Sequence, residues 1–172
     1  IELSPSFSDA FTNRGMLLME RGQYNQALVD FDRAIELDTS NALAWLNRGV
    51  TLFSLNRYTE ALESLKRPTA VENEITELVN YNCGRVYEAQ RNMKQARQHY
   101  KIAYEMNPIN IEFMFRYARS EGVLFNLKKA EEVVMKGLRG FPNNTDLLIL
   151  LSEIQATKGE FRNALYSANQ AQ

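Results

Sequence analysis

The stretch that decides the fold is residues 42–65, ALAWLNRGVTLFSLNRYTEALESL, which repeats the stretch SDAFTNRGMLLMERGQYNQALVDF at residues 8–31. The two stretches lie 34 residues apart, and Asn13-Arg14-Gly15 of the first falls on Asn47-Arg48-Gly49 of the second. A recurrence with a fixed period of this length is typical of proteins built from stacked structural repeats. The repeat, rather than any single motif, therefore determines the architecture.

The period continues through the rest of the chain at three positions that carry small residues. Successive copies are 34 residues apart, except for one spacing of 35 between the second and third copies. The first position holds Gly15, Gly49, Gly84, Ala118 and Ser152, the second Ala27, Ala61, Ala96, Ala130 and Ala164, and the third Ala34, Pro68, Ala103, Gly137 and Ala171. Small side chains at a fixed spacing allow neighbouring helices to approach closely, whereas bulky ones would push the helix axes apart.

Each repeat is predicted to form two helices joined by a tight turn. Apolar residues recur with the 3.6-residue period of a helix and do not alternate as they would in a strand. In the first repeat this period predicts helices over residues 9–21 and 25–37, separated by a break at Gly22 and followed by the polar turn 38–41. The apolar stripe of the first helix is predicted to contain Phe11, Leu17 and Leu18.

These residues resemble the tetratricopeptide repeat, which combines an aromatic residue and a glycine in its first helix with tyrosine, alanine and phenylalanine in its second. The resemblance covers essentially the whole chain, as a single array over 1–172 with repeats at 8–41, 42–75, 77–110, 111–144 and 145–172. Residues 1–7 resemble the tail of a preceding repeat and the last repeat is incomplete, so we expect a fragment truncated at both ends. The resemblance implies an all-α fold, an α-solenoid of antiparallel helix pairs that forms a right-handed superhelix.

Pro68 departs from the small-residue pattern in the second repeat. Proline inside a helix removes a hydrogen bond and clashes with the preceding turn, at a cost of roughly 3 kcal/mol. The second helix of this repeat is therefore predicted to stop or kink near Arg67. The proline is either a local accommodation or a hinge between the second and third repeats.

Composition argues against several classes of function. The net charge is −1, from 20 basic and 21 acidic residues, which argues against a nucleic-acid-binding module. No apolar run approaches the roughly 18–20 residues that span a bilayer, so no membrane insertion is expected. The single cysteine, Cys83, excludes an internal disulfide and a cysteine-cluster metal site. Without a signal peptide at residues 1–5, we expect a cytoplasmic protein.

The sequence offers no constellation for catalysis. The only histidine, His99, lies on a predicted second helix among polar residues, and no Ser/His/Asp set or phosphate-binding glycine loop is present. Cys83 is predicted to be a buried structural thiol. We therefore expect no enzyme activity, no catalytic residues, no metal and no cofactor.

What such a fold offers is a surface. Stacked helical repeats create an extended concave face, which in tetratricopeptide proteins is lined by the first helices. The positions that flank the buried stripe of those helices are the predicted peptide-binding residues. They are Asn13, Met16, Leu43, Leu46, Asn47, Val50, Phe53, Tyr81, Asn82, Arg85, Phe115, Arg116 and Arg119.

Three of these residues, Asn13, Asn47 and Asn82, occupy the same place in successive repeats. Asparagine has a poor helix propensity, but its amide can both donate to and accept from a peptide backbone. The arrangement resembles the asparagine ladder of the O-linked N-acetylglucosamine transferase superhelix, which holds extended peptide. The alternative is that these amides form hydrogen bonds between neighbouring helices.

The other predicted groove residues are mainly apolar and adaptable, and an apolar stretch on an open face marks a binding site. Arg85, Arg116 and Arg119 could grip a carboxylate. We therefore predict a non-catalytic protein–protein interaction scaffold that binds an extended peptide or helix of a partner. The alternative is the substrate-selecting or regulatory region of a larger enzyme such as a glycosyltransferase. Apolar faces at the terminal repeats also suggest a homodimer.

Overall fold

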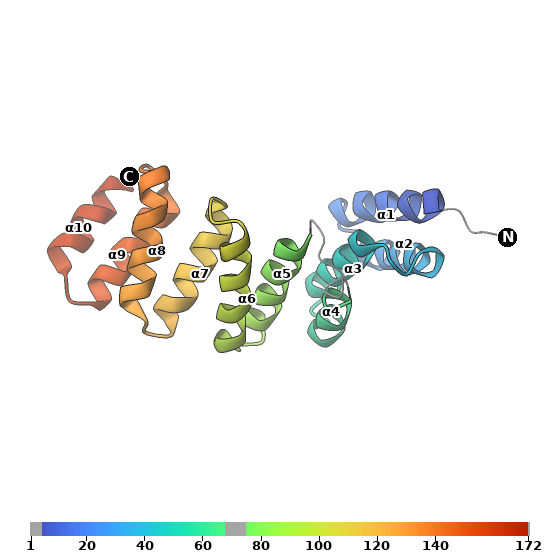
Figure 1. The fold of residues 1–172 in the computed structure, drawn as a ribbon, viewed down its shortest axis with the longest axis horizontal. Helices are drawn as coiled ribbons and strands as arrows, with labels where there is room; N and C mark the ends of the chain where they lie inside the picture. Colours follow the sequence, from blue (N-terminus) through green and yellow to red (C-terminus); the bar gives the residue numbers. More distant parts are fainter. Residues whose placement is uncertain (1–4, 68–74, 172) are drawn as a thin grey trace. The chain divides into compact units, whose positions relative to one another are not determined.

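The computed structural model describes residues 5–67 and 75–171, and in these residues the chain forms ten α-helices and no strand (Figure 1). The helices are α1 (Pro5–Glu20), α2 (Tyr24–Leu37), α3 (Ala42–Ser54), α4 (Tyr58–Leu65), α5 (Thr76–Ala89), α6 (Met93–Met106), α7 (Ile111–Val123), α8 (Leu127–Gly140), α9 (Thr145–Thr157) and α10 (Phe161–Gln170). The predicted all-α fold of antiparallel helix pairs is confirmed. Odd-numbered helices are the first helices of their repeats, and even-numbered helices are the second.

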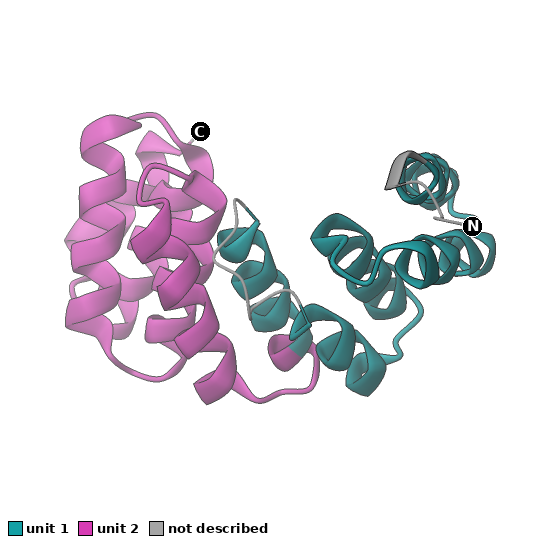
Figure 2. Ribbon diagram, turned by 45° about the vertical axis from the view of Figure 1, so that its right-hand side comes forward, with its two compact units in different colours: residues 1–86 teal, residues 87–172 magenta. Residues whose placement is uncertain are grey.

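The chain divides into two compact units, residues 1–86 and 87–172, and the division falls within α5 (Figure 2). In the first unit α1 packs against α2, α2 packs against α3, and α3 packs against α4. In the second unit the same order runs from α6 to α10, and α7 also packs against α9. Each unit therefore has its own stack of helices.

Close contacts at the small residues hold the helix pairs of the first unit together. A Cβ added to Gly15 would lie 2.6 Å from Cε1 of Phe31, and one added to Gly49 would lie 2.6 Å from Cγ of Leu65. Phe31 and Leu65 are fully buried. The glycines are needed here because the facing side chains fill the space that a Cβ would occupy.

Asparagine side chains set the start of three first helices. The Oδ1 atoms of Asn41, Asn110 and Asn144 accept the backbone N–H three residues later, at 2.9, 3.2 and 3.0 Å. Such caps satisfy one of the four amide donors that a helix leaves free at its N-terminus. Each cap follows the turn that closes the preceding repeat.

Two predictions for α1 were wrong. The helix begins at Pro5 and not near residue 9, since proline suits the first helical position, where its missing N–H is not needed. Leu17 is 54% exposed, although it was predicted to lie in the buried stripe. The buried residues of α1 include Thr12 and Gly15, and Leu17 points about 200° away from Gly15 around the helix.

The shortened second helix of the second repeat is confirmed. Helix α4 has 8 residues and ends at Leu65, whereas its counterparts α2 and α6 each have 14. Arg67, where the helix was predicted to stop, lies beyond its last turn. Pro68 itself lies outside the described residues, so its role as a hinge stays a prediction.

Candidate functional site

The predicted contact residues on the first helices differ widely in exposure. Asn13 and Leu43 are exposed, and Met16, Val50, Phe53, Tyr81 and Phe115 are half-buried. Leu46 and Asn47 are only 5% and 8% exposed, so the prediction that both face outward was wrong. Helix α3 is contacted by α1 as well as by α2 and α4, and this extra neighbour covers part of the face that was expected to be open.

The amide of Asn47 is the unusual feature of this face. Its Nδ2 atom is buried and has no hydrogen-bond partner within the described parts of the chain. A buried amide without a partner costs about 1–3 kcal/mol, and native structures contain few such groups. The Asn47 amide is therefore a donor that the described residues leave unsatisfied.

The third asparagine of the series is engaged within its own helix. Nδ2 of Asn82 donates to the carbonyl oxygen of Leu78 at 2.8 Å, and Nη1 of Arg85 donates to Oδ1 of Asn82 at 3.2 Å. Both ends of this amide thus have partners. The three asparagines share a place in the repeat but not a set of contacts, and Asn47 alone of the three has a buried, unpartnered donor.

Arg85 also packs on aromatic rings of the same face. Its guanidinium carbon lies 4.6 Å from the ring centre of Phe53 and 5.8 Å from that of Tyr81. Cation–π contacts of this kind contribute about 0.5–1 kcal/mol at exposed sites and hold the planar group over the rings. Arg85, Phe53 and Tyr81 therefore form one cluster, in which the arginine is held in place.

The two arginines of α7 face a carboxylate in the second unit. Nη1 of Arg116 lies 3.5 Å from Oε2 of Glu88, and Nη1 of Arg119 lies 3.5 Å from Oε1 of the same residue. The hydroxyl of Tyr100 donates to Glu88 at 2.5 Å, and Nε of Arg116 donates to Glu112 at 2.8 Å. The guanidinium groups that were predicted to grip a partner's carboxylate thus already surround one from this chain.

Sequence reasoning missed Glu88. It lies 35 residues after Phe53, so the spacing of the repeat places it at an equivalent position, and this signal could have found it. Its position between two arginines could not be derived from spacing, because it depends on side-chain direction.

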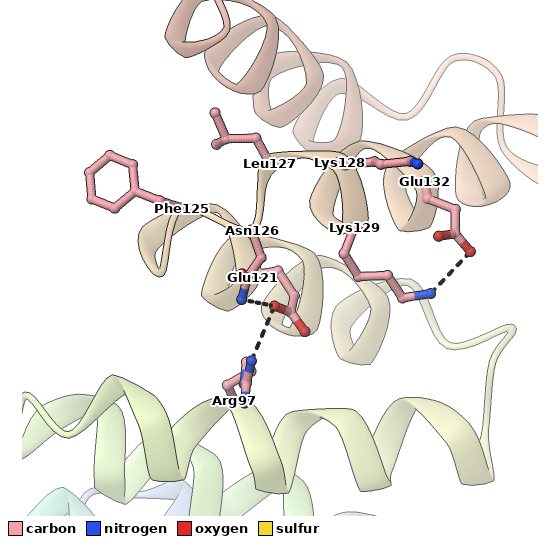
Figure 3. A pocket seen from close by; sticks show the side chains of 8 residues that line it. All are labelled: Arg97, Glu121, Phe125, Asn126, Leu127, Lys128, Lys129 and Glu132. Carbon is pink, nitrogen blue, oxygen red and sulfur yellow. Dashed lines mark hydrogen bonds and ion pairs between the residues drawn. The ribbon is translucent and has the colours of Figure 1, made fainter.

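Two pockets in the second unit adjoin the turn between α7 and α8. The larger, of about 610 Å³, is shown in Figure 3 and is lined by Arg97, Glu121, Phe125, Asn126, Leu127, Lys128, Lys129 and Glu132. The smaller, of about 370 Å³, lies beside α9 and is lined by residues that include Arg119, Leu150 and Glu153. Of the predicted contact residues, Arg119 therefore lines a pocket.

Cys83 is buried as predicted, and burial raises the pKa of its thiol to about 11. A thiol that stays protonated at neutral pH is a poor nucleophile and a poor metal ligand. Among the described residues no group of three or more His, Cys, Asp or Glu side chains could hold a metal ion. No described helix combines the length and apolar character that crossing a bilayer would require.

Comparisons with known proteins agree with the repeat pattern. A family model described as TPR repeat matches residues 15–56, and one described as tetratricopeptide repeat matches residues 79–110. The chain therefore contains tetratricopeptide repeats in these two ranges. No curated protein sequence matches it significantly.

Solved structures of tetratricopeptide-repeat proteins share the fold. YrrB, described as a TPR protein with an unusual peptide-binding site, is 23% identical with a TM-score of 0.79, over 94% of this chain and 82% of that one. MamA is 16% identical with a TM-score of 0.84, over 98% and 91%. PilF of Pseudomonas aeruginosa is 20% identical with a TM-score of 0.82, over 96% and 75%. At these identities the likeness concerns the fold alone.

Proposed function

We propose that this chain is a non-catalytic scaffold that holds an extended peptide segment of a partner protein along its first helices. Tetratricopeptide repeats serve as protein-interaction scaffolds, and the chain has the fold of one. The observation that carries the proposal is the buried Nδ2 atom of Asn47, which lacks an acceptor. Once rotation of the Asn47 side chain turns this amide toward the open face, a peptide carbonyl would supply that acceptor without any requirement on the peptide's side chains.

The neighbouring residues suit a peptide of mixed character. Met16, Val50 and Phe53 offer partly exposed apolar surface on α1 and α3. Methionine and aromatic side chains adapt to varied shapes and are enriched at interfaces. Peptides bind more weakly than globular partners of the same area because their ordering opposes binding, so preorganised donors matter for affinity. We infer that the amide fixes the peptide backbone while the apolar residues take its side chains.

The test uses peptides selected from a displayed random library on the full chain, with affinities then measured by fluorescence anisotropy. Asn47→Ala is expected to weaken binding about tenfold, which corresponds to about 1.4 kcal/mol. The same substitution is expected to leave the melting temperature unchanged or raised. It removes an unsatisfied donor and replaces asparagine with the best helix former.

Asn80 provides a matched control. It is also 8% exposed and lies on a first helix, but its Nδ2 donates to the carbonyl oxygen of Thr76 at 2.9 Å. Asn80→Ala is expected to lower the melting temperature and to leave peptide affinity unchanged. If Asn47→Ala lowers stability and keeps the affinity, the amide is structural and the proposal is wrong.

A further inference from the structure

The turns inside the helix pairs share one backbone position with a left-handed conformation. In every repeat the turn holds a residue with a positive φ: Gly22 at 73°, Asn56 at 59°, Arg91 at 60°, Phe125 at 59° and Gly159 at 82°. Glycine adopts this left-handed conformation without strain, and asparagine tolerates it. For other residues it costs roughly 1–2 kcal/mol, and for a bulky one it is an outlier. Phe125 is the bulkiest residue of the set.

Burial does not compensate for this strain. The side chain of Phe125 is 79% exposed, so the fold gains little apolar burial from it. In Figure 3 its ring projects from the turn, away from the Arg97–Glu121 pair. Arg91 has the same backbone conformation, but its side chain is charged, whereas the ring of Phe125 adds exposed apolar surface to the turn. The left-handed conformation of Phe125 therefore costs the isolated fold free energy that burial of its ring does not recover.

The ring lines two neighbouring pockets of the second unit. Phe125 and Leu127 line both the pocket of about 610 Å³ and the pocket of about 370 Å³. Val123, which is 50% exposed, lines the smaller one. A side chain that enters either pocket therefore meets an aromatic and an aliphatic surface that the chain leaves uncovered.

The larger pocket also carries an unbalanced positive charge. Arg97 lies 3.6 Å from the buried Glu121, which also accepts a hydrogen bond from Asn126 at 2.7 Å. Lys129 pairs with Glu132 at 3.0 Å (Figure 3). Lys128 is exposed and has no carboxylate partner among the described residues. The pocket thus holds three cations and two carboxylates, and one further carboxylate would balance it.

We propose that Phe125 anchors a second docking site, for a segment of a partner protein that carries an aliphatic or aromatic side chain beside a carboxylate. The apolar side chain packs on Phe125 and Leu127, and the carboxylate pairs with Lys128. The strain at the turn is then offset by the partner, because an apolar contact in a binding site regains the burial that the isolated chain lacks. The site lies in the second unit and does not depend on the Asn47 amide.

The test again starts from a displayed random peptide library, selected on the full chain after depletion on the Phe125→Gly variant. Peptides that remain are expected to carry an aliphatic or aromatic residue next to Asp or Glu. Phe125→Gly is expected to weaken their binding at least tenfold and to raise the melting temperature, since glycine relieves the left-handed strain. Arg91→Gly, at the same position of the preceding repeat, should raise the melting temperature and leave binding unchanged.

A substitution at Lys128 tests the contribution of the ion pair separately from that of the Phe125 ring. Lys128→Gln is expected to weaken binding severalfold, and so is an Asp→Asn change in the peptide. The two changes together should cost no more than either alone, because they remove the same ion pair. Unchanged binding by Phe125→Gly, or fully additive losses at Lys128, would overturn the proposal. So would a library that yields no peptide dependent on Phe125, or self-association of the chain through this ring.

Discussion

Cys83 shows how burial changes the chemistry of a single side chain. The thiol is 2% exposed, and burial raises its pKa to about 11, whereas an exposed thiol has a pKa of about 8.5. The folded state therefore keeps a proton that the unfolded state loses. The resulting stability is fully present below about pH 8.5 and is lost as the pH rises through about 11.

We predict that the advantage of the wild type over Cys83→Ala in free energy of unfolding shrinks across this pH window. Denaturant titrations of both proteins below and within the window measure it, and the comparison cancels the titration of other groups. A difference that stays constant across the window would show that the folded thiol titrates normally.

Glu88 occupies the place that a partner's carboxylate would take between Arg116 and Arg119. We predict that Glu88→Gln raises the affinity for an oligoglutamate peptide severalfold at low salt, because both guanidinium groups lose their internal competitor. Glu36→Gln changes the net charge equally at the exposed Arg33–Glu36 pair of α2, in the first unit, and serves as the control. Equal gains in the two variants would point to bulk charge and not to the two arginines.

At the scale of helices, Gly137 tests how closely α8 packs against its neighbours. A Cβ at this position would lie 2.8 Å from Cδ1 of Leu147 on α9 and would also collide with Sδ of Met114 on α7. Overpacking costs typically 1–3 kcal/mol, and the better helix propensity of alanine offsets about 1 kcal/mol of it. We predict that Gly137→Ala lowers the free energy of unfolding by up to about 2 kcal/mol.

Gly140 lies in the same helix and supplies the control. No atom lies within 4 Å of a Cβ built on it, so Gly140→Ala removes conformational freedom without adding a clash. Its free energy of unfolding should stay the same or rise by less than about 1 kcal/mol. Chemical denaturation measures the free energy of unfolding of both variants. Equal values would contradict the close packing of α8.

The sequence also shows which properties of an element can be predicted. Glycine and alanine at a spacing of 34 residues predicted the helix pairs, because close approach requires small side chains. Proline at residue 68 predicted the early end of α4. The start of α1 at Pro5 was missed, because a proline is equally compatible with the end of one helix and with the first residue of the next.

At the scale of the whole molecule, repetition predicts the architecture better than it predicts the binding surface. Every copy of the repeat adds evidence for the same helix pair, whereas exposure depends on what packs against each copy. Leu46 and Asn47 are buried on α3, which packs against α1, α2 and α4, whereas Asn13, at the place on α1 equivalent to Asn47, is exposed. The Glu88 cluster escaped prediction for the same reason, because Glu88 lies on α5 and its partners come from two other helices, α6 and α7.

The last helix exposes an apolar face. The equivalent helices of the first two repeats bury the corresponding position. Leu165 is 65% exposed, whereas Leu28 and Leu62 at the equivalent positions are 8% and 9% exposed. Phe161 and Tyr166 on the same helix are 72% and 68% exposed. A cluster of exposed large apolar side chains favours association, because burial contributes about 25 cal/mol for each square ångström removed from water.

We predict that the chain self-associates through this face of α10, so that its mean sedimentation coefficient falls on dilution. Leu165→Gln should shift the equilibrium toward the monomer by about tenfold or more, with little change in melting temperature because the side chain is already exposed. Ile109→Gln is the matched control, since Ile109 is 77% exposed but lies in the turn between α6 and α7. A concentration-independent monomer, or equal effects of the two variants, would show that α10 does not mediate association.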